Sequence, residues 1–265
     1  SPGTRAESRE ERPDRPAVLD PGRQSEHPGR SLTFALVRST LVEWEQAYER
    51  SWQVGARAVL DGRHLTDTPP RDQGRWGVSF LLRPDAVAVE RLAALATEAG
   101  SLVGPRQCWI HGTDFLHVSV RALEPHRTTV PLDDPRVLRY VEALHETAAK
   151  ASPVSLRLVG LTLSPRGVLA CGVPADGAAE NLRRVLGDAL VARQVGEFEA
   201  GSRRDMWHST LVHFTGPIAD PPGLVAWVRH RRRVDLGTML ASDLELVHYT
   251  YADGRMRIVR LGTAA

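Results

Sequence analysis

The sequence predicts an α+β fold built from two similar halves that a pseudo-twofold axis relates. Residues 117–119 read His-Val-Ser and residues 208–210 read His-Ser-Thr, each in a stretch of strand character, and the histidines are 91 positions apart. Each motif is preceded by a helical stretch and followed by a second helix and two strand-like runs around a glycine turn. Because this order occurs twice, we expect the two histidine strands to face each other across a groove.

The N-terminal part of the chain differs in composition from the rest. Residues 1–30 are rich in Pro, Arg, Glu, Gly and Ser, with almost nothing apolar to bury, which predicts a disordered tail. Residues 31–73 should form a helical extension, with an apolar stripe over 32–60, followed by a linker. This helix could pack on one lobe, cover the groove or bind a partner. Residues 74–265 should form one domain of two lobes.

In the first lobe, apolar residues at helical spacing alternate with short strand-like runs. The elements expected, in order, are a strand over 75–82, a helix over 84–99, the histidine strand 115–121, a helix opened at 133–135, and a hairpin of 154–163 and 168–173. The glycine of this hairpin turn is Gly167.

The second lobe repeats the order with little sequence identity. The elements expected are a helix over 178–194, the histidine strand 206–214, a helix opened by the prolines at 221–222, and a hairpin of 239–250 and 255–261. Its turn glycine, Gly254, follows Gly167 by 87 positions, close to the offset of the histidines.

The two motifs are informative about function because the same order of helices and strands surrounds each of them. Strand side chains alternate between two faces, so His117 and Ser119 point the same way, as do His208 and Thr210. A single His-x-Ser would mean little, because chance supplies it often. A symmetric fold would bring together two imidazoles and two hydroxyls, a set that can move protons on and off oxygen while holding a phosphate.

With these motifs in this order, residues 74–265 resemble the two-histidine (2H) phosphoesterase superfamily, which includes the bacterial 2′-5′ RNA ligase-like proteins. The resemblance implies a bilobal fold in which two antiparallel sheets face a central groove with helices outside, here with an N-terminal helical extension. It also implies that His117 and His208 are catalytic and that Ser119 and Thr210 bind phosphate. Ser119 stands where threonine is commoner, and it keeps the hydroxyl donor.

The residue types suit paired general acid–base catalysis on a phosphodiester. Histidine titrates near neutral pH, so one imidazole can be neutral while the other is charged. The neutral ring takes a proton from the attacking hydroxyl or water, and the charged ring gives one to the leaving oxygen. Hydroxyl donors stabilise the charge that builds up on the non-bridging oxygens. We therefore expect no cofactor and no metal, while the sequence leaves open which histidine is the base.

Three further residues could belong to the site, and a fourth is expected to lie outside it. By strand alternation Arg121 shares the face of Ser119, so it either binds the phosphate or points into water. Trp207 and Tyr249 could stack on a base, although a tryptophan beside a strand core is more typical of packing. The odd spacing of His213 from His208 predicts that it faces away from the groove.

The expected function is that of a metal-independent phosphodiesterase, or a ligase in reverse. It would act on 2′,3′-cyclic phosphate or 2′-5′ phosphodiester bonds of RNA ends or nucleotides. One alternative is an enzyme of the same fold acting on a small cyclic nucleotide or an ADP-ribose-type metabolite. Another is a nucleotide-binding module without turnover. The natural substrate and the direction of the reaction stay open.

Composition agrees with a globular enzyme. Hydrophobic residues make up 42% of the chain and charged residues 25%, and a net charge of +2 does not demand a nucleic-acid partner. Two cysteines, Cys108 and Cys171, are too few for a disulfide framework or a zinc cluster. Neither a membrane span nor a secretory leader is visible in the sequence. We therefore expect a cytoplasmic monomer without a membrane or a stable protein partner.

Overall fold

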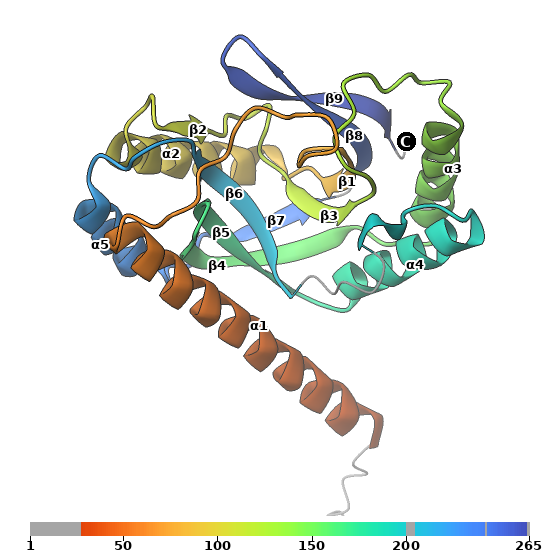
Figure 1. Cartoon of the computed structure of the whole chain (residues 1–265). Helices are drawn as coiled ribbons and strands as arrows, with labels where there is room; N and C mark the ends of the chain where they lie inside the picture. The colour runs from red at the N-terminus through yellow and green to blue at the C-terminus, as the bar shows by residue number, and fades with distance from the viewer. Residues whose placement is uncertain (1–27, 200–204, 242, 264–265) are drawn as a thin grey trace, which may run out of the picture.

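The computed structural model describes residues 28–199, 205–241 and 243–263, and within them the chain forms five α-helices and nine strands (Figure 1). The predicted α+β class is therefore confirmed. None of the helices in these ranges is long and apolar enough to span a bilayer. The disordered tail expected over residues 1–30 falls almost entirely on residues 1–27, outside the described residues.

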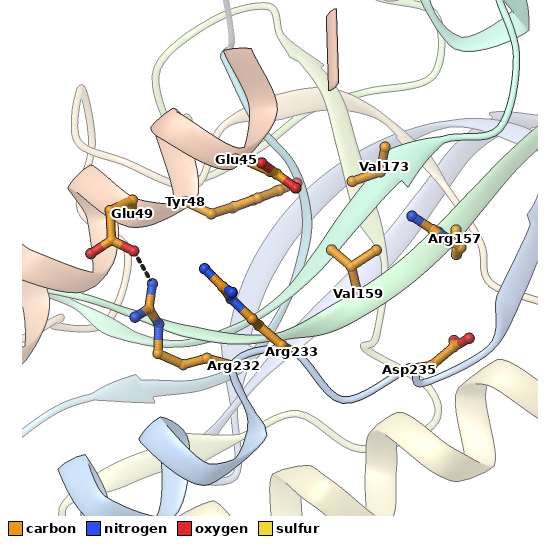
Figure 2. A pocket seen from close by; sticks show the side chains of 9 residues that line it. All are labelled: Glu45, Tyr48, Glu49, Arg157, Val159, Val173, Arg232, Arg233 and Asp235. Carbon is orange, nitrogen blue, oxygen red and sulfur yellow. Dashed lines mark hydrogen bonds and ion pairs between the residues drawn. The ribbon is translucent and has the colours of Figure 1, made fainter. Parts of the chain in front are cut away.

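The N-terminal extension forms one long helix, α1 (Pro28–Leu60), that packs on one lobe. Trp44, Tyr48 and Trp52 recur along α1 and are buried, which is the apolar stripe seen in the sequence. The Tyr48 hydroxyl lies 2.5 Å from the carbonyl oxygen of Gly172 and 2.6 Å from that of Trp207. Figure 2 shows Tyr48 and Glu49 on the side of α1 that faces the sheet. Of the three possibilities for this helix, the structure shows packing on a lobe.

The first half of the domain follows the predicted order with one strand added. Its elements are β1 (Val78–Leu82), α2 (Ala86–Val103), β2 (Cys108–Ile110), β3 (Val118–Ala122), α3 (Pro135–Ala148), β4 (Val154–Ser164) and β5 (Gly167–Pro174). The side chains of Asp85 and Asp134 accept hydrogen bonds from backbone amides in the first turns of α2 and α3, which explains where these helices begin. The short strand β2 was not predicted, and β1 starts three residues later than expected.

The second half contains α4 (Ala178–Ala192), a short 3₁₀ turn η1 (Glu197–Glu199), β6 (Trp207–Phe214), α5 (Pro221–Arg231), β7 (Thr238–Ala241), β8 (Leu244–Ala252) and β9 (Arg255–Thr263). The single strand predicted over 239–250 is wrong, because it is divided between β7 and β8. Strand β7 pairs with β4, whereas β8 pairs with β1 and β9. One apolar run therefore serves two different parts of the sheet.

The strands follow the order β7-β4-β5-β6-β3-β1-β8-β9, with β2 added beside β6, and every pairing is antiparallel. The two halves of this path meet between β6 and β3, where a single residue pair, Val118 and Ser209, is in register. Around this junction β3 corresponds to β6, β1 to β5 and β8 to β4. The histidine strands are therefore neighbours at the centre of one nine-stranded sheet whose two halves are pseudo-symmetric.

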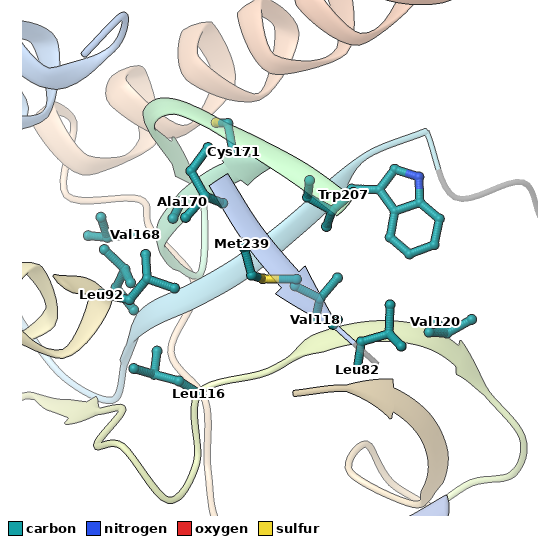
Figure 3. Close-up of a cluster of buried hydrophobic side chains, with 14 of the residues drawn as sticks. Leu82, Leu92, Leu116, Val118, Val120, Val168, Ala170, Cys171, Trp207 and Met239 are labelled. Carbon is teal, nitrogen blue, oxygen red and sulfur yellow. The ribbon is translucent and has the colours of Figure 1, made fainter. Parts of the chain in front are cut away.

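The core lies between the sheet and the helices, and strand residues next to the motif side chains are part of it. Val118, Val120 and Trp207 are buried and belong to the same cluster as Leu82 and Met239 (Figure 3). A second, smaller cluster of buried residues is formed by Leu81, Trp109, Phe115, Val247, Tyr249 and Met256. Because the residues between the motif side chains are buried, the motif side chains themselves point away from the main core.

The contact of α1 with the sheet gives a test of how far the extension supports the domain. We predict that Tyr48→Phe lowers the free energy of unfolding by about 1–3 kcal/mol, because two buried carbonyls lose their donor. Chemical denaturation measures the change. Tyr140→Phe is the matched control, since Tyr140 is equally buried but its hydroxyl has no hydrogen-bond partner within the described part of the chain. Equal losses in both variants would contradict the prediction.

Candidate functional site

A cavity of about 570 Å³ opens where β3 and β6 meet. His117 and Ser119 of the first motif and His208 and Thr210 of the second all line it. The remaining lining residues are Gln73, Gly74, Arg75, Trp76, Gly77, Ser79, Ala122, Glu124, Phe198, Glu199, His213 and Tyr249. The structure thus brings together the four motif side chains that the sequence singled out.

His117 is held at both ring nitrogens. Its Nδ1 is 2.7 Å from the carbonyl oxygen of Phe115, and because a carbonyl can only accept, Nδ1 must carry a hydrogen. Its Nε2 is 2.9 Å from the hydroxyl of Tyr249. In the neutral ring, Nε2 then bears the lone pair and accepts from Tyr249. This tautomer keeps a basic nitrogen on the side of the ring that faces the cavity.

His208 and Thr210 approach the cavity from β6, and both are half-buried. Between them Ser209 is fully buried, as expected for the alternate face of a strand. Ser119 is also half-buried, so both motif hydroxyls lie at a surface that a ligand can reach. Two imidazoles and two hydroxyl donors around one cavity can transfer protons and bind the oxygens of a phosphate.

Arg121 does not reach the cavity, so the prediction that it shares the face of Ser119 is wrong. In β3, Ser119 pairs with Leu81 but Arg121 pairs with Phe80, which leaves Val120 as one extra residue. This β-bulge reverses the alternation after the motif. Arg121 therefore lies on the face of Phe80, where its Nη2 donates to the carbonyl of Gly196 after α4 at 3.4 Å.

His213 lines the cavity, so the prediction that it faces away is also wrong. In β6, Thr210 pairs with Leu169 and Val212 with Val168, which leaves Leu211 as the extra residue of a second bulge. The bulge brings His213 back to the face of Thr210. It occupies the same place relative to its motif as Ala122 does in β3. A one-residue bulge leaves no mark in the apolar pattern, so strand alternation alone could not place either residue.

Of the two aromatic candidates, only Tyr249 lines the cavity. Trp207 is fully buried against α4, where its Nε1 donates to Glu180 at 3.1 Å and the Arg183 guanidinium lies 3.6 Å from the ring centroid. It lines no part of the cavity, so a stacking role for Trp207 is contradicted. Tyr249 does line the cavity, but its ring is 3% exposed and packs against Trp76 and Phe115. Tyr249 therefore acts on the site through its hydroxyl.

A buried histidine pair supports the floor of the cavity. His213 Nδ1 and His111 Nε2 are 2.9 Å apart and share one hydrogen, which requires a lone pair on one of the rings. Burial lowers the pKa of His111 to about 3 and that of His213 well below its ordinary value. Asp67 Oδ2 lies 3.8 Å from His213 Nε2, but two arginines already neutralise this carboxylate. Burial therefore decides the direction in which the pKa of His213 shifts.

A second cavity, of about 370 Å³, lies between α1, β4, β5 and the turn after α5 (Figure 2). Three arginines and three carboxylates line it, and Arg232 is paired with Glu49. It contains no histidine, and the Tyr48 hydroxyl beside it already bonds two backbone carbonyls. Of the two cavities, only the first therefore contains histidines. Among the described residues, no cluster of three or more His, Cys, Asp or Glu could hold a metal ion.

No protein-family model matches the sequence, and no curated protein matches it. Solved structures do match the fold. Escherichia coli LigT complexed with 3′-AMP superposes with a TM-score of 0.50 at 14% identity, over 71% of this chain and 96% of that one. A structure described as a phosphoesterase gives a TM-score of 0.50 at 15% identity, over 74% and 97%. The chain therefore has the LigT-like fold, which confirms the fold that the resemblance implied.

The buried histidine pair predicts a loss of stability in acid. Both rings are neutral in the folded protein, whereas in the unfolded chain they take up protons below about pH 6.5. The free energy of unfolding should therefore be fully retained above that pH and fall as the pH drops toward 3, by about 1.4 kcal/mol per pH unit for each proton.

Denaturation curves between pH 4 and 7 measure this slope. His213→Gln should have a shallower slope than the wild type, because one of the two groups no longer titrates. His230→Gln, which replaces an exposed histidine, is the control and should keep the wild-type slope. The prediction fails if His213→Gln and the wild type have the same slope.

Proposed function

We propose that this protein is a metal-independent phosphodiesterase of the two-histidine type that acts on nucleotides or RNA ends. The observation that carries the proposal is the convergence of His117, Ser119, His208 and Thr210 on one cavity where the two halves of the sheet meet. The cavity volume of about 570 Å³ falls in the range of pockets that bind small molecules, and it suits a nucleotide. LigT, which shares the fold, has been solved with 3′-AMP bound.

In the proposed reaction, a 2′,3′-cyclic phosphate is opened by water. The neutral histidine removes a proton from the water as its oxygen forms a bond to phosphorus. The charged histidine gives its proton to the ribose oxygen as the bond from phosphorus to that oxygen breaks. Ser119 and Thr210 donate hydrogen bonds to the non-bridging oxygens, where negative charge increases in the transition state. A 2′-5′ phosphodiester is split or joined by the same two proton transfers.

Tyr249 has a defined part in this scheme. Its hydroxyl fills the hydrogen-bonding position at His117 Nε2, the nitrogen that must meet the substrate. The attacking or leaving oxygen of the substrate takes over this position when it binds. Tyr249 is thus a positioning residue that keeps the ring oriented in the free protein. The monomeric state and the cytoplasmic location expected from the sequence stay predictions.

We predict that His117→Ala and His208→Ala each reduce kcat on a 2′,3′-cyclic nucleotide by at least about 10²-fold, since each removes one proton-transfer partner. The double variant should be scarcely slower than either single variant, because the two histidines act as a unit. Ser119→Ala and Thr210→Ala should lose less, since each removes one hydrogen bond. Steady-state kinetics with the purified protein measure these changes.

His230→Ala is the control for loss of a histidine outside the cavity, and it should keep wild-type kcat. Additive losses in the double variant would contradict paired catalysis. Binding of the nucleotide without turnover by the wild type would instead identify a nucleotide-binding module.

A further inference from the structure

The loop that precedes β1 forms one wall of the cavity and is rigidly held. Its Gln73 amide donates to the carbonyl of His126, and the His126 amide donates to the carbonyl of Gly74, both at 2.9 Å. A Cβ at Gly77 would lie 2.0 Å from the carbonyl oxygen of Glu124, so only glycine allows this close approach. The backbone of this loop is therefore fixed in place.

Arg75 is the charged side chain that this loop contributes. It lines the cavity, and its side chain is 51% exposed. Its guanidinium forms an ion pair with Asp67 and lies 5.2 Å from the centroid of the Trp76 ring. The pairing and the ring contact hold the guanidinium in one position while leaving part of it open to a ligand.

The charges around Arg75 do not cancel. Asp67 Oδ1 is shared between Arg75 and Arg166, the latter at 3.1 Å, so one carboxylate faces two guanidinium groups and leaves a net positive charge. Arg75 is the only lysine or arginine among the described residues that line the cavity. Two carboxylates line the same cavity: Glu124 is paired with Arg127 at 2.7 Å, and Glu199 accepts a hydrogen bond from the backbone amide of Ala122 at 2.9 Å. An anion entering the cavity is therefore drawn toward Arg75.

This charge lies away from the reacting phosphate. Asp67, which holds Arg75, lies next to His213. His213 is five positions beyond His208 on β6, and because the bulge takes up one of them, the two lie four ladder steps apart, roughly 13 Å along the strand. The motif histidines and hydroxyls hold one phosphate, and Arg75 has the position for another anionic group of the same substrate.

We propose that Arg75 binds a second, non-reacting phosphate, so that the preferred substrates are nucleotides or RNA ends with a phosphate besides the one that reacts. This inference rests on the proposed function, because it takes the motif residues as the site of the reacting phosphate. It replaces the role that strand alternation gave to Arg121.

Calorimetric titration of the full chain with adenosine 2′-monophosphate and adenosine 2′,5′-bisphosphate tests the proposal. The wild type should bind the bisphosphate about tenfold more tightly, as expected for one charge-assisted contact. Arg75→Gln should bind both ligands within about twofold of each other, whereas Arg75→Lys should keep part of the gain. A thermal melt of each variant checks folding. If Arg75→Gln does not fold, Arg75→Met, which keeps the aliphatic contact with Trp76, takes its place.

Arg166→Gln is a graded control, because it leaves the cavity lining intact but removes one of the two positive charges around Asp67, so it should keep part of the tenfold gain. The proposal is overturned if the wild type shows no gain, if Arg75→Gln keeps it, or if Arg166→Gln loses it equally. Binding does not depend on turnover. Failure of the proposed function would appear separately, as absent hydrolysis of adenosine 2′,3′-cyclic phosphate by the wild type.

Discussion

The site depends on how β3 and β6 meet at the centre of the sheet. Only Val118 and Ser209 are paired there, so the ladder between the two histidine strands is one residue pair long and does not continue along the strands. Both residues are buried, and the strand alternation around them turns His117, Ser119, His208 and Thr210 to the opposite side. A longer ladder between these strands would close the space that the cavity occupies.

Two bulges then decide which side chains complete the cavity. Each follows its motif by one residue, at Val120 in β3 and at Leu211 in β6. The first removes Arg121 from the site, and the second brings in His213, whose burial and contact with His111 require a neutral ring. The positive charge needed for an anionic substrate therefore has to come from elsewhere, and Arg75 on the loop before β1 supplies it.

The features predicted correctly from the sequence are those governed by regular periodicity. The helices follow their apolar stripes, and the alternation of His-x-Ser and His-x-Thr holds because both motifs end before the bulges. Arg121 and His213 were misplaced because one inserted residue reverses alternation without changing composition. For Trp207 the packing alternative is the correct one, since this side chain packs on α4 as a tryptophan beside a strand core usually does. Arg75 could not be found, because its position depends on the long-range pairing of Asp67 with Arg166.

In the proposed mechanism, two histidines of this cavity share the acid and base roles without a metal. The most direct test is the pH dependence of kcat/KM for adenosine 2′,3′-cyclic phosphate, measured with and without EDTA. One neutral and one charged imidazole require a bell-shaped profile, which the chelator should leave unchanged. A metal-bound hydroxide would need a single deprotonation. A rate that rises to an alkaline plateau, or that vanishes with EDTA, would contradict the two-histidine mechanism.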